Sequence, residues 1–233
     1  CIMQSASDLL GLAGGKPKLI TLLTSGTGTY VPTVDMARCL VRIQAGGGGG
    51  ASTGNNAGGA GAMIEIFFRI PIAGLAYSVG AGGAVETGGS MSTLGQFSAM
   101  PGAGGVNGGS PGMGGVIGAL MGPVDTDGAS ITVSGMAGVS GGFGGNGSVA
   151  GGLPGFPIDP PNATTYAAAV PAHYSTVWSN NHRNGQGNAS GGNSFYGKGG
   201  TTGNAPATTA YGAGGGFNAA GRGGCIEIFD FGA

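Results

Sequence analysis

The chain has few charged side chains: 8 Lys and Arg and 9 Asp and Glu among 233 residues, with a net charge of −1. Disordered chains stay in solution through high net charge and low hydrophobicity. This chain has neither property, because its mean hydropathy is +0.21. The composition therefore favours an ordered protein, although it contains 58 Gly and 12 Pro. The same lack of charge removes the basic surface that nucleic acids need, so nucleic acid is not expected as a partner.

Long apolar runs and a cysteine framework are also missing. No apolar stretch approaches the roughly 18 residues of a membrane span, and no basic stretch precedes a long apolar core as in a signal peptide. We therefore expect no membrane insertion. The chain has 3 Cys, an odd number, and Cys39 and Cys225 fall in apolar segments. This pattern favours buried thiols over a disulfide framework.

The residue patterns of metal, cofactor and catalytic sites are absent from the sequence as well. His173 and His182 lack the spacing and the cysteine partners of a zinc site. The Asp125–Gly128 segment lacks the later ligands of a calcium loop, and no amphipathic helix follows a glycine run as phosphate binding requires. The acidic residues show no distinguishable catalytic pair. We expect no cofactor, no metal and no enzymatic activity.

What the sequence does have is glycine with a period of three. Glycine occupies every third position from Gly135 to Gly147, and a second run comprises Gly109, Gly112, Gly115 and Gly118. A helix of the polyproline II type has three residues per turn, so such a period leaves one face bare for close approach of another backbone. The runs are too short and too poor in proline for collagen. The period predicts a compact stack of short polyglycine II helices.

Apolar segments with strand character bracket this glycine-rich body. Residues 37–45 alternate: Cys39, Val41, Ile43 and Ala45 lie on an apolar face, and the face that carries the arginines has Arg38, Leu40, Arg42 and Gln44. Further strands are predicted at residues 19–23, 63–70, 76–79, 131–133 and 225–231. The predicted fold class is all-β with polyglycine II helices and little or no α-helix, in which glycine-rich excursions leave and return to a small β base.

Several ordered blocks of residues resemble the glycine-rich domain at the distal end of bacteriophage tail fibres. The resemblance covers about residues 19–105 and 200–233, whereas residues 106–202 depart from the common pattern. It rests on a set of strand and glycine blocks in the same order: Thr24–Thr27, Tyr30–Pro32, Gly46–Gly50, Tyr77–Gly83, Gly88–Gly95 and Gly223–Phe231.

The resemblance implies a receptor-binding tip similar to the polyglycine II adhesins of T-even-like phages. On this basis residues 1–15 are a linker from an upstream fibre segment, and residues 16–233 form the tip domain. Its β base spans about residues 19–79 and 225–231, and the polyglycine II and loop region about 80–224. The implied partner is a bacterial surface polysaccharide or protein, and the implied location is the distal tip of a virion tail fibre. Tail fibres are generally trimeric, so we expect a homotrimer.

Large aromatic, amide and cationic side chains concentrate between residues 162 and 196, which contain the only Trp and both His residues. Rigid aromatic rings with nearby amide groups are typical of binding surfaces. The receptor-binding candidates are Tyr166, His173, Tyr174, Trp178, Asn181, His182, Arg183 and Tyr196. An alternative of equal weight is that these aromatics pin a long loop onto the scaffold.

Other functions remain open alternatives to adhesion. They are a structural glycine-rich protein, an ice-binding protein with a flat polyglycine II face, and a tailspike-type tip that cleaves polysaccharide. An ice-binding face would need a repeated Thr or Ala column along the triplets, and the Gly135 run has none.

Overall fold

The computed structural model describes residues 18–32, 39–53, 56–68, 70, 73–107, 112–115, 132–136 and 191–230. These residues form strands, turns and extended segments, and they contain no helix. The all-β prediction is therefore confirmed for the described part of the chain. The strands are β1 Lys18–Leu23, β2 Thr27–Tyr30, β3 Cys39–Gln44, β4 Met63–Phe68, β5 Leu75–Ser78, β6 Ser92–Leu94, β7 Phe97–Ala99, β8 Thr132–Met136 and β9 Cys225–Asp230.

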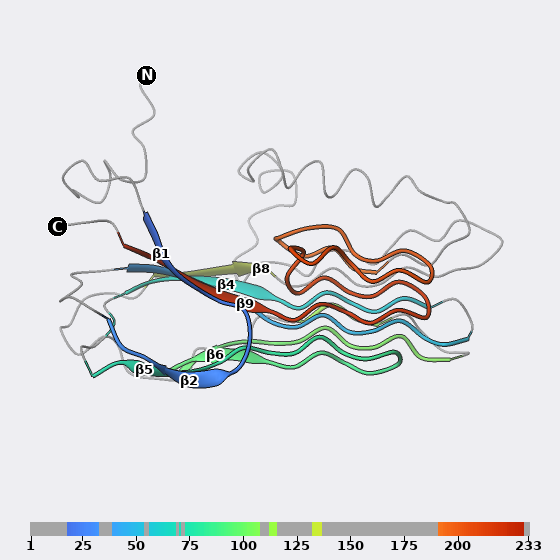
Figure 1. Ribbon diagram of the computed structural model, residues 1–233, viewed down its shortest axis with the longest axis horizontal. Helices are drawn as coiled ribbons and strands as arrows, with labels where there is room; N and C mark the ends of the chain where they lie inside the picture. The colour runs from blue at the N-terminus through green and yellow to red at the C-terminus, as the bar shows by residue number, and fades with distance from the viewer. Residues whose placement is uncertain are drawn as a thin grey trace, which may run out of the picture.

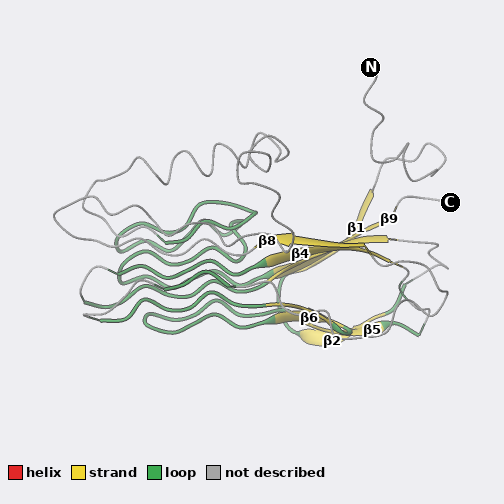
Figure 2. Ribbon diagram, turned by 180° about the vertical axis from the view of Figure 1, so that it is seen from behind, coloured by secondary structure: helices red, strands yellow, loops and turns green. Residues whose placement is uncertain are grey.

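The strands form two antiparallel sheets. One has the order β1-β9-β3-β4-β8 and the other has the order β2-β5-β6-β7. Figure 2 shows the two sheets facing each other at one end of the molecule. Strand β9 comes from the end of the described chain and pairs with both β1 and β3, which lie near its beginning. The predicted β base is thus made of two sheets, and its two parts are distant in sequence.

Apolar side chains from both sheets form the core between them. On β3 the alternation places Val41 and Ile43 inward, and both are fully buried in one cluster with their partners on β9, Ile228 and Ile226. The second sheet contributes Leu94 and Phe97 to the same cluster. Burial of such side chains contributes about 1.5–3 kcal/mol each. The cluster is therefore the main apolar contribution to the stability of the base.

Three details differ from the sequence prediction. Strands β2, β6 and β7 were not predicted, because they are short and lack a long alternating pattern. The β6–β7 hairpin has a two-residue turn at Gly95, where φ is +56° and glycine is favoured. Gln44 was predicted on the polar face but is fully buried, with its Nε2 donating to the carbonyl of Gly61 at 2.9 Å. Gly135, predicted to begin a glycine helix, lies in β8 opposite Ile64.

Glycine-rich segments leave the strands and return to them, as the sequence predicts. The chain runs outward after β3, β5 and β7, and it runs inward before β4, β6 and β9. Figure 1 shows these segments side by side, extending away from the strand end as a bundle. Residues 45–51 and 56–62, which fall within the predicted base, belong to this bundle. The bundle places its turns at the end far from the sheets.

Residues 45–51 lie at the centre of the bundle. Their successive N–H groups donate hydrogen bonds to three neighbouring segments in turn. Gly46, Gly47 and Gly48 donate to Ser90, Arg222 and Gly59, and the next three residues repeat the same order of neighbours with Thr87, Ala219 and Asn56. A β-strand, by contrast, bonds to two neighbours in one plane. The hydrogen bonds of this segment therefore have a period of three residues.

The successive carbonyl groups of the same segment accept hydrogen bonds from three further segments in turn. The carbonyls of residues 46–51 accept from Gly102, Gly83, Gly215, Gly105, Glu86 and Asn218 in that order. The period recurs at the predicted run beginning at Gly109, because Gly112 and Gly115 donate to Ala57 and Ala60. The triplets between residues 138 and 147 lie outside the described residues. At Gly112 and Gly115, therefore, the period of three in glycine coincides with a period of three in hydrogen bonding.

Close approach explains why these positions are glycine. A Cβ atom added to Gly49 would lie well inside 3.0 Å of the carbonyl of Ala84, which is a backbone group and cannot swing away. Gly88, in a returning segment, has its nearest neighbour at 3.4 Å, an ordinary van der Waals distance. A side chain is thus excluded at glycines such as Gly49, whereas the position of Gly88 has room for a methyl group.

We expect Gly49→Ala to lower the free energy of unfolding by about 1–3 kcal/mol or more, because the added methyl group overpacks a rigid contact. Gly88→Ala is the matched control and should leave stability unchanged or slightly raised. Thermal denaturation of the two variants measures the difference. Equal melting temperatures for the two variants would show that the centre of the bundle is not closely packed.

Candidate functional site

Tyr196 is the one predicted receptor-binding residue that the structure describes. It lies in the turn after Ser194, above the five-stranded sheet and at the base end of the bundle. The other candidates lie outside the described residues: Tyr166, His173, Tyr174, Trp178, Asn181, His182 and Arg183. The structure therefore places one of the predicted residues and leaves the grouping of the rest as a prediction.

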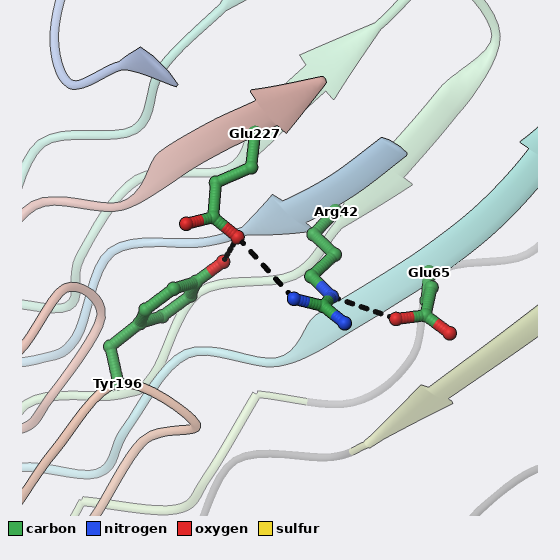
Figure 3. Close-up of polar contacts among 4 residues, drawn as sticks. All are labelled: Arg42, Glu65, Tyr196 and Glu227. Atoms are coloured by element: carbon green, nitrogen blue, oxygen red, sulfur yellow. Dashed lines mark hydrogen bonds and ion pairs between the residues drawn. The ribbon is translucent and has the colours of Figure 1, made fainter. Parts of the chain in front are cut away.

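The Tyr196 hydroxyl donates to Glu227 Oε2 at 2.7 Å, and Glu227 belongs to a row of charges across the sheet (Figure 3). Arg42 Nε donates to Glu65 Oε2 at 2.7 Å, and Arg42 Nη1 lies 3.8 Å from Glu227 Oε2. Figure 3 shows the guanidinium between the two carboxylates. We call Arg42, Glu65, Tyr196 and Glu227 the base cluster.

Strand register creates the base cluster. Arg42 on β3 is directly opposite Glu65 on β4 and directly opposite Glu227 on β9. Opposite charges at such cross-strand positions contribute about 0.2–1 kcal/mol per pair. The alternation of β3 indicated the face on which Arg42 lies, but the sequence does not reveal which strands flank β3. The cluster was missed because the pairing joins segments far apart in the chain.

Aromatic rings enclose the guanidinium of Arg42. Its Cζ lies 5.3 Å from the ring centre of Phe195 and 5.0 Å from that of Phe229. Tyr196 packs edge-on against Phe195 and Tyr211, at 5.0 and 5.7 Å between ring centres. Cation–π contacts of this kind contribute about 0.5–1 kcal/mol at exposed sites and more when desolvated. These contacts fasten the 194–197 turn to the sheet.

Burial governs the titration of the groups beneath this turn. It raises the pKa of the Tyr196 hydroxyl above its ordinary range, and the neighbouring Cys225 and Glu227 add to the effect. Burial also raises the pKa of the Cys225 thiol to about 12, with an opposing contribution from the Tyr196 hydrogen bond and a further rise from the Glu227 charge. Both groups are therefore neutral at pH 7. The thiols of Cys39 and Cys225 are buried and neither is part of a disulfide, which confirms the prediction made for them.

The polar groups of the base cluster interact with one another and serve to pack the turn onto the sheet. Its two carboxylates are both engaged with Arg42, and its tyrosine is engaged with a carboxylate and two rings. For Tyr196, these contacts match the alternative in which aromatics pin a loop to the scaffold. Whether the remaining candidates bind or pack stays a prediction.

A second set of residues, most of them polar, lies at the opposite end of the bundle, where the outgoing segments turn back. Its exposed members come from turns that are distant in sequence, and we call them the distal face: Ser52, Thr53, Glu86, Val106, Asn107, Thr202 and Asn218. Glu86 and Asn218 have left-handed backbone, with φ of +65° and +54°. Loops on a rigid scaffold commonly present varied side chains for binding.

Hydrogen bonds link three of these turns. Ser52 donates to Glu86 Oε1 from its N–H at 3.1 Å and also from its hydroxyl. Asn107 Nδ2 donates to the same oxygen and lies 3.1 Å from Ser52 Oγ, while Thr53 N–H donates to Asn107 Oδ1 at 2.7 Å. These hydrogen bonds, led by the Ser52 hydroxyl, lower the pKa of Glu86. The carboxylate therefore stays ionised and accepting at neutral pH.

Exposed apolar surface adjoins these polar groups. Val106 is 57% exposed, and its carbonyl accepts from the buried Asn56 at 2.7 Å, so its backbone is fixed while its side chain is free. In such a surface the apolar side chain can contact the apolar face of a sugar, and the surrounding hydroxyl, amide and carboxylate groups can bond to its hydroxyl groups. The same mixture suits a protein surface. The signal in the sequence was weak, since these residues are scattered over small turns between glycine runs.

The described part of the chain shows neither a metal-ligand group nor a membrane-spanning helix. It contains no group of three His, Cys, Asp or Glu residues that could hold a metal ion. The same residues include no helix of the length and apolar character needed to cross a membrane.

Neither a family model nor a curated protein matches this chain.

We expect Tyr196→Phe to lower the free energy of unfolding by about 1 kcal/mol, because Glu227 loses a hydrogen bond to its charged oxygen. Tyr211→Phe is the matched control: this tyrosine lies in the same aromatic group, but its hydroxyl has no hydrogen bond within the described residues. Chemical denaturation compares the two. Similar losses in both variants, or none in Tyr196→Phe, would mean that the hydroxyl does not fasten the turn.

Proposed function

We propose that this chain is the receptor-binding tip of a bacteriophage tail fibre, and that it binds a polysaccharide or protein on the bacterial surface during adsorption. In this proposal the glycine-rich bundle consists of polyglycine II helices, which form a stiff rod between the β base and the distal face. The chain acts as an adhesin and not as an enzyme, and its location is the distal end of the fibre in the virion.

The observation that carries the proposal is the three-way rotation of hydrogen bonds along residues 45–51. A helix with three residues per turn directs successive N–H groups about 120° apart, so each helix can bond to neighbours on all sides. In such a bundle nearly all backbone N–H and C=O groups form hydrogen bonds with other backbone groups. Buried backbone groups need such partners to avoid a cost in free energy. This supports the polyglycine II conformation and the resemblance to phage adhesins that share it.

The distal face supports the second half of the proposal. The close-packed glycines of the bundle offer no side chains for recognition, whereas its turns carry exposed ones. The side chains at these turns, Ser52, Thr53, Glu86, Val106 and Asn107, offer hydroxyl, carboxylate, apolar and amide chemistry. The candidates that lie outside the described residues, from Tyr166 to Arg183, are proposed as further anchors, with Tyr174 and Trp178 foremost.

The polysaccharide-cleaving alternative gains no support from the base cluster. Glu65 and Glu227 are brought to either side of Arg42, as two carboxylates across a bond would be, but the guanidinium occupies the space between them. Glycoside hydrolysis needs that space for the scissile bond. An adhesin without hydrolytic activity accounts better for this arrangement.

We expect the purified protein to bind whole host bacteria, and to lose binding to surface mutants that lack the receptor. Trp178→Ala and Tyr174→Ala should each weaken binding by about thirtyfold, the typical effect of truncating an anchor worth 2 kcal/mol. Tyr211→Ala, at the base end of the bundle, is the control and should retain affinity after correction for folding. Cell-binding assays with labelled protein give the affinities.

Two results would count against these assignments. Full binding by Trp178→Ala and Tyr174→Ala would move the contact surface to the described turns of the distal face. Failure of the wild-type protein to bind any bacterium in a broad panel would contradict the adhesin proposal itself.

We further propose a homotrimer, since a chain with costly glycine content is stabilised by assembly. Light scattering on the purified protein is expected to give three times the mass of the 22.0 kDa chain. A stable monomer at micromolar concentration would contradict the trimer and would leave the adhesin proposal intact.

A further inference from the structure

Glu86 has an unusual backbone for its residue type. Its φ is +65°, a conformation that glycine adopts freely and that asparagine tolerates, but that a glutamate side chain makes unfavourable. The neighbouring turn at residues 217–218 uses Asn at the corresponding left-handed position. Strained backbone of this kind costs of the order of 1–3 kcal/mol, and it persists where the surrounding structure holds it.

The carboxylate of Glu86 accounts for the residue at this position. Its Oε1 accepts from the Ser52 N–H, the Ser52 hydroxyl and Asn107 Nδ2, which come from two other turns. Asn107 in turn accepts the Thr53 N–H at 2.7 Å. The backbone contributes one more link, because Glu86 N–H donates to Gly50 at 2.9 Å. Neither glycine nor asparagine could reach both neighbouring turns with a charged acceptor.

We propose that Glu86 is a positioning residue that locks three turns of the distal face, at residues 52–53, 85–86 and 106–107, into one preorganised contact surface. It acts through the Ser52 and Asn107 side chains, and the exposed Val106 beside Asn107 is held in place with them. Preorganised loops bind more tightly because less ordering is required on association. The link to binding rests on the proposed function, whereas the locking of the turns does not.

The Ser52 and Thr53 N–H groups report on the lock directly, since the side chains of Glu86 and Asn107 are their acceptors. In Glu86→Gly, amide hydrogen exchange at both residues should be about threefold to tenfold faster, the effect of losing one ordinary hydrogen bond. Exchange at Gly48, bonded to Gly59 in the bundle, should not change. The melting temperature should stay constant or rise, because glycine relieves the strained φ.

A conservative variant and a binding assay complete the test. Glu86→Gln keeps an acceptor oxygen of the same reach and should restore most of the protection. Glu86→Gly should bind host cells about threefold to tenfold more weakly, with Glu86→Gln close to wild type.

Each possible failure has a separate meaning. Unchanged exchange at Ser52 and Thr53 in Glu86→Gly, or faster exchange throughout the bundle, would overturn the lock. Faster local exchange with unaltered affinity for host cells would overturn its role in binding. If the wild-type protein binds no bacterium, the adhesin proposal fails, and the exchange data still decide whether the lock exists.

Discussion

The structure depends on backbone hydrogen bonds made by the central segment, residues 45–51. Its N–H groups reach three neighbouring segments and its carbonyls reach three others, so the bundle is held by contacts that no side chain makes. Such bonds require backbones to approach within hydrogen-bonding distance on every side. That requirement excludes Cβ atoms at positions such as Gly48 and Gly49, where one would collide with a neighbouring carbonyl. Glycine content, segment spacing and molecular shape follow from this one constraint.

The β base gives the bundle its register. Strand β3 leads directly into residues 45–51, and β4 and β9 are entered directly from segments that flank them. Residues at the junction reinforce the transition: Ser92 of one sheet donates to the carbonyl of Gln44 in the other at 2.8 Å and accepts from Gly80 at 2.8 Å. The paired strands fix where each glycine segment starts, so the turns end at one distal face. A conventional sandwich core thereby positions a bundle that has few side chains of its own.

Prediction from sequence succeeded for elements that show a local residue pattern. It failed for elements that depend on pairing between segments distant in the chain. The alternation of residues 39–43 and the apolar character of residues 63–66 and 225–228 predicted strands that the structure confirms. The three-residue period at Gly112 and Gly115 likewise recurs in their hydrogen bonds. The short β6–β7 hairpin carries too few residues to show a period, and Gly135 belongs to a strand because Ile64 of β4 lies opposite it.

For the candidate sites, too, local composition was informative, whereas contacts between distant segments were not predicted. Composition drew attention to aromatic residues, and for Tyr196 the structure gives contacts to Glu227 and to neighbouring rings. The lock around Glu86 could not be predicted from sequence. Ser52, Glu86 and Asn107 meet only because the three glycine-rich segments that carry them turn back at the same distance from the sheets. A left-handed glutamate has no sequence signature. Sites that depend on the register of distant segments become visible only in three dimensions.

Scalar couplings across hydrogen bonds, measured by NMR on labelled protein, test the account most directly, because they identify the acceptor of each N–H group. The account predicts couplings from Gly47, Gly48 and Gly49 to the carbonyl carbons of Arg222, Gly59 and Thr87, so that three successive residues bond to three different segments. Couplings in which Gly47 and Gly49 share one neighbouring segment, as alternate residues of a β-strand do, would contradict the three-way bundle.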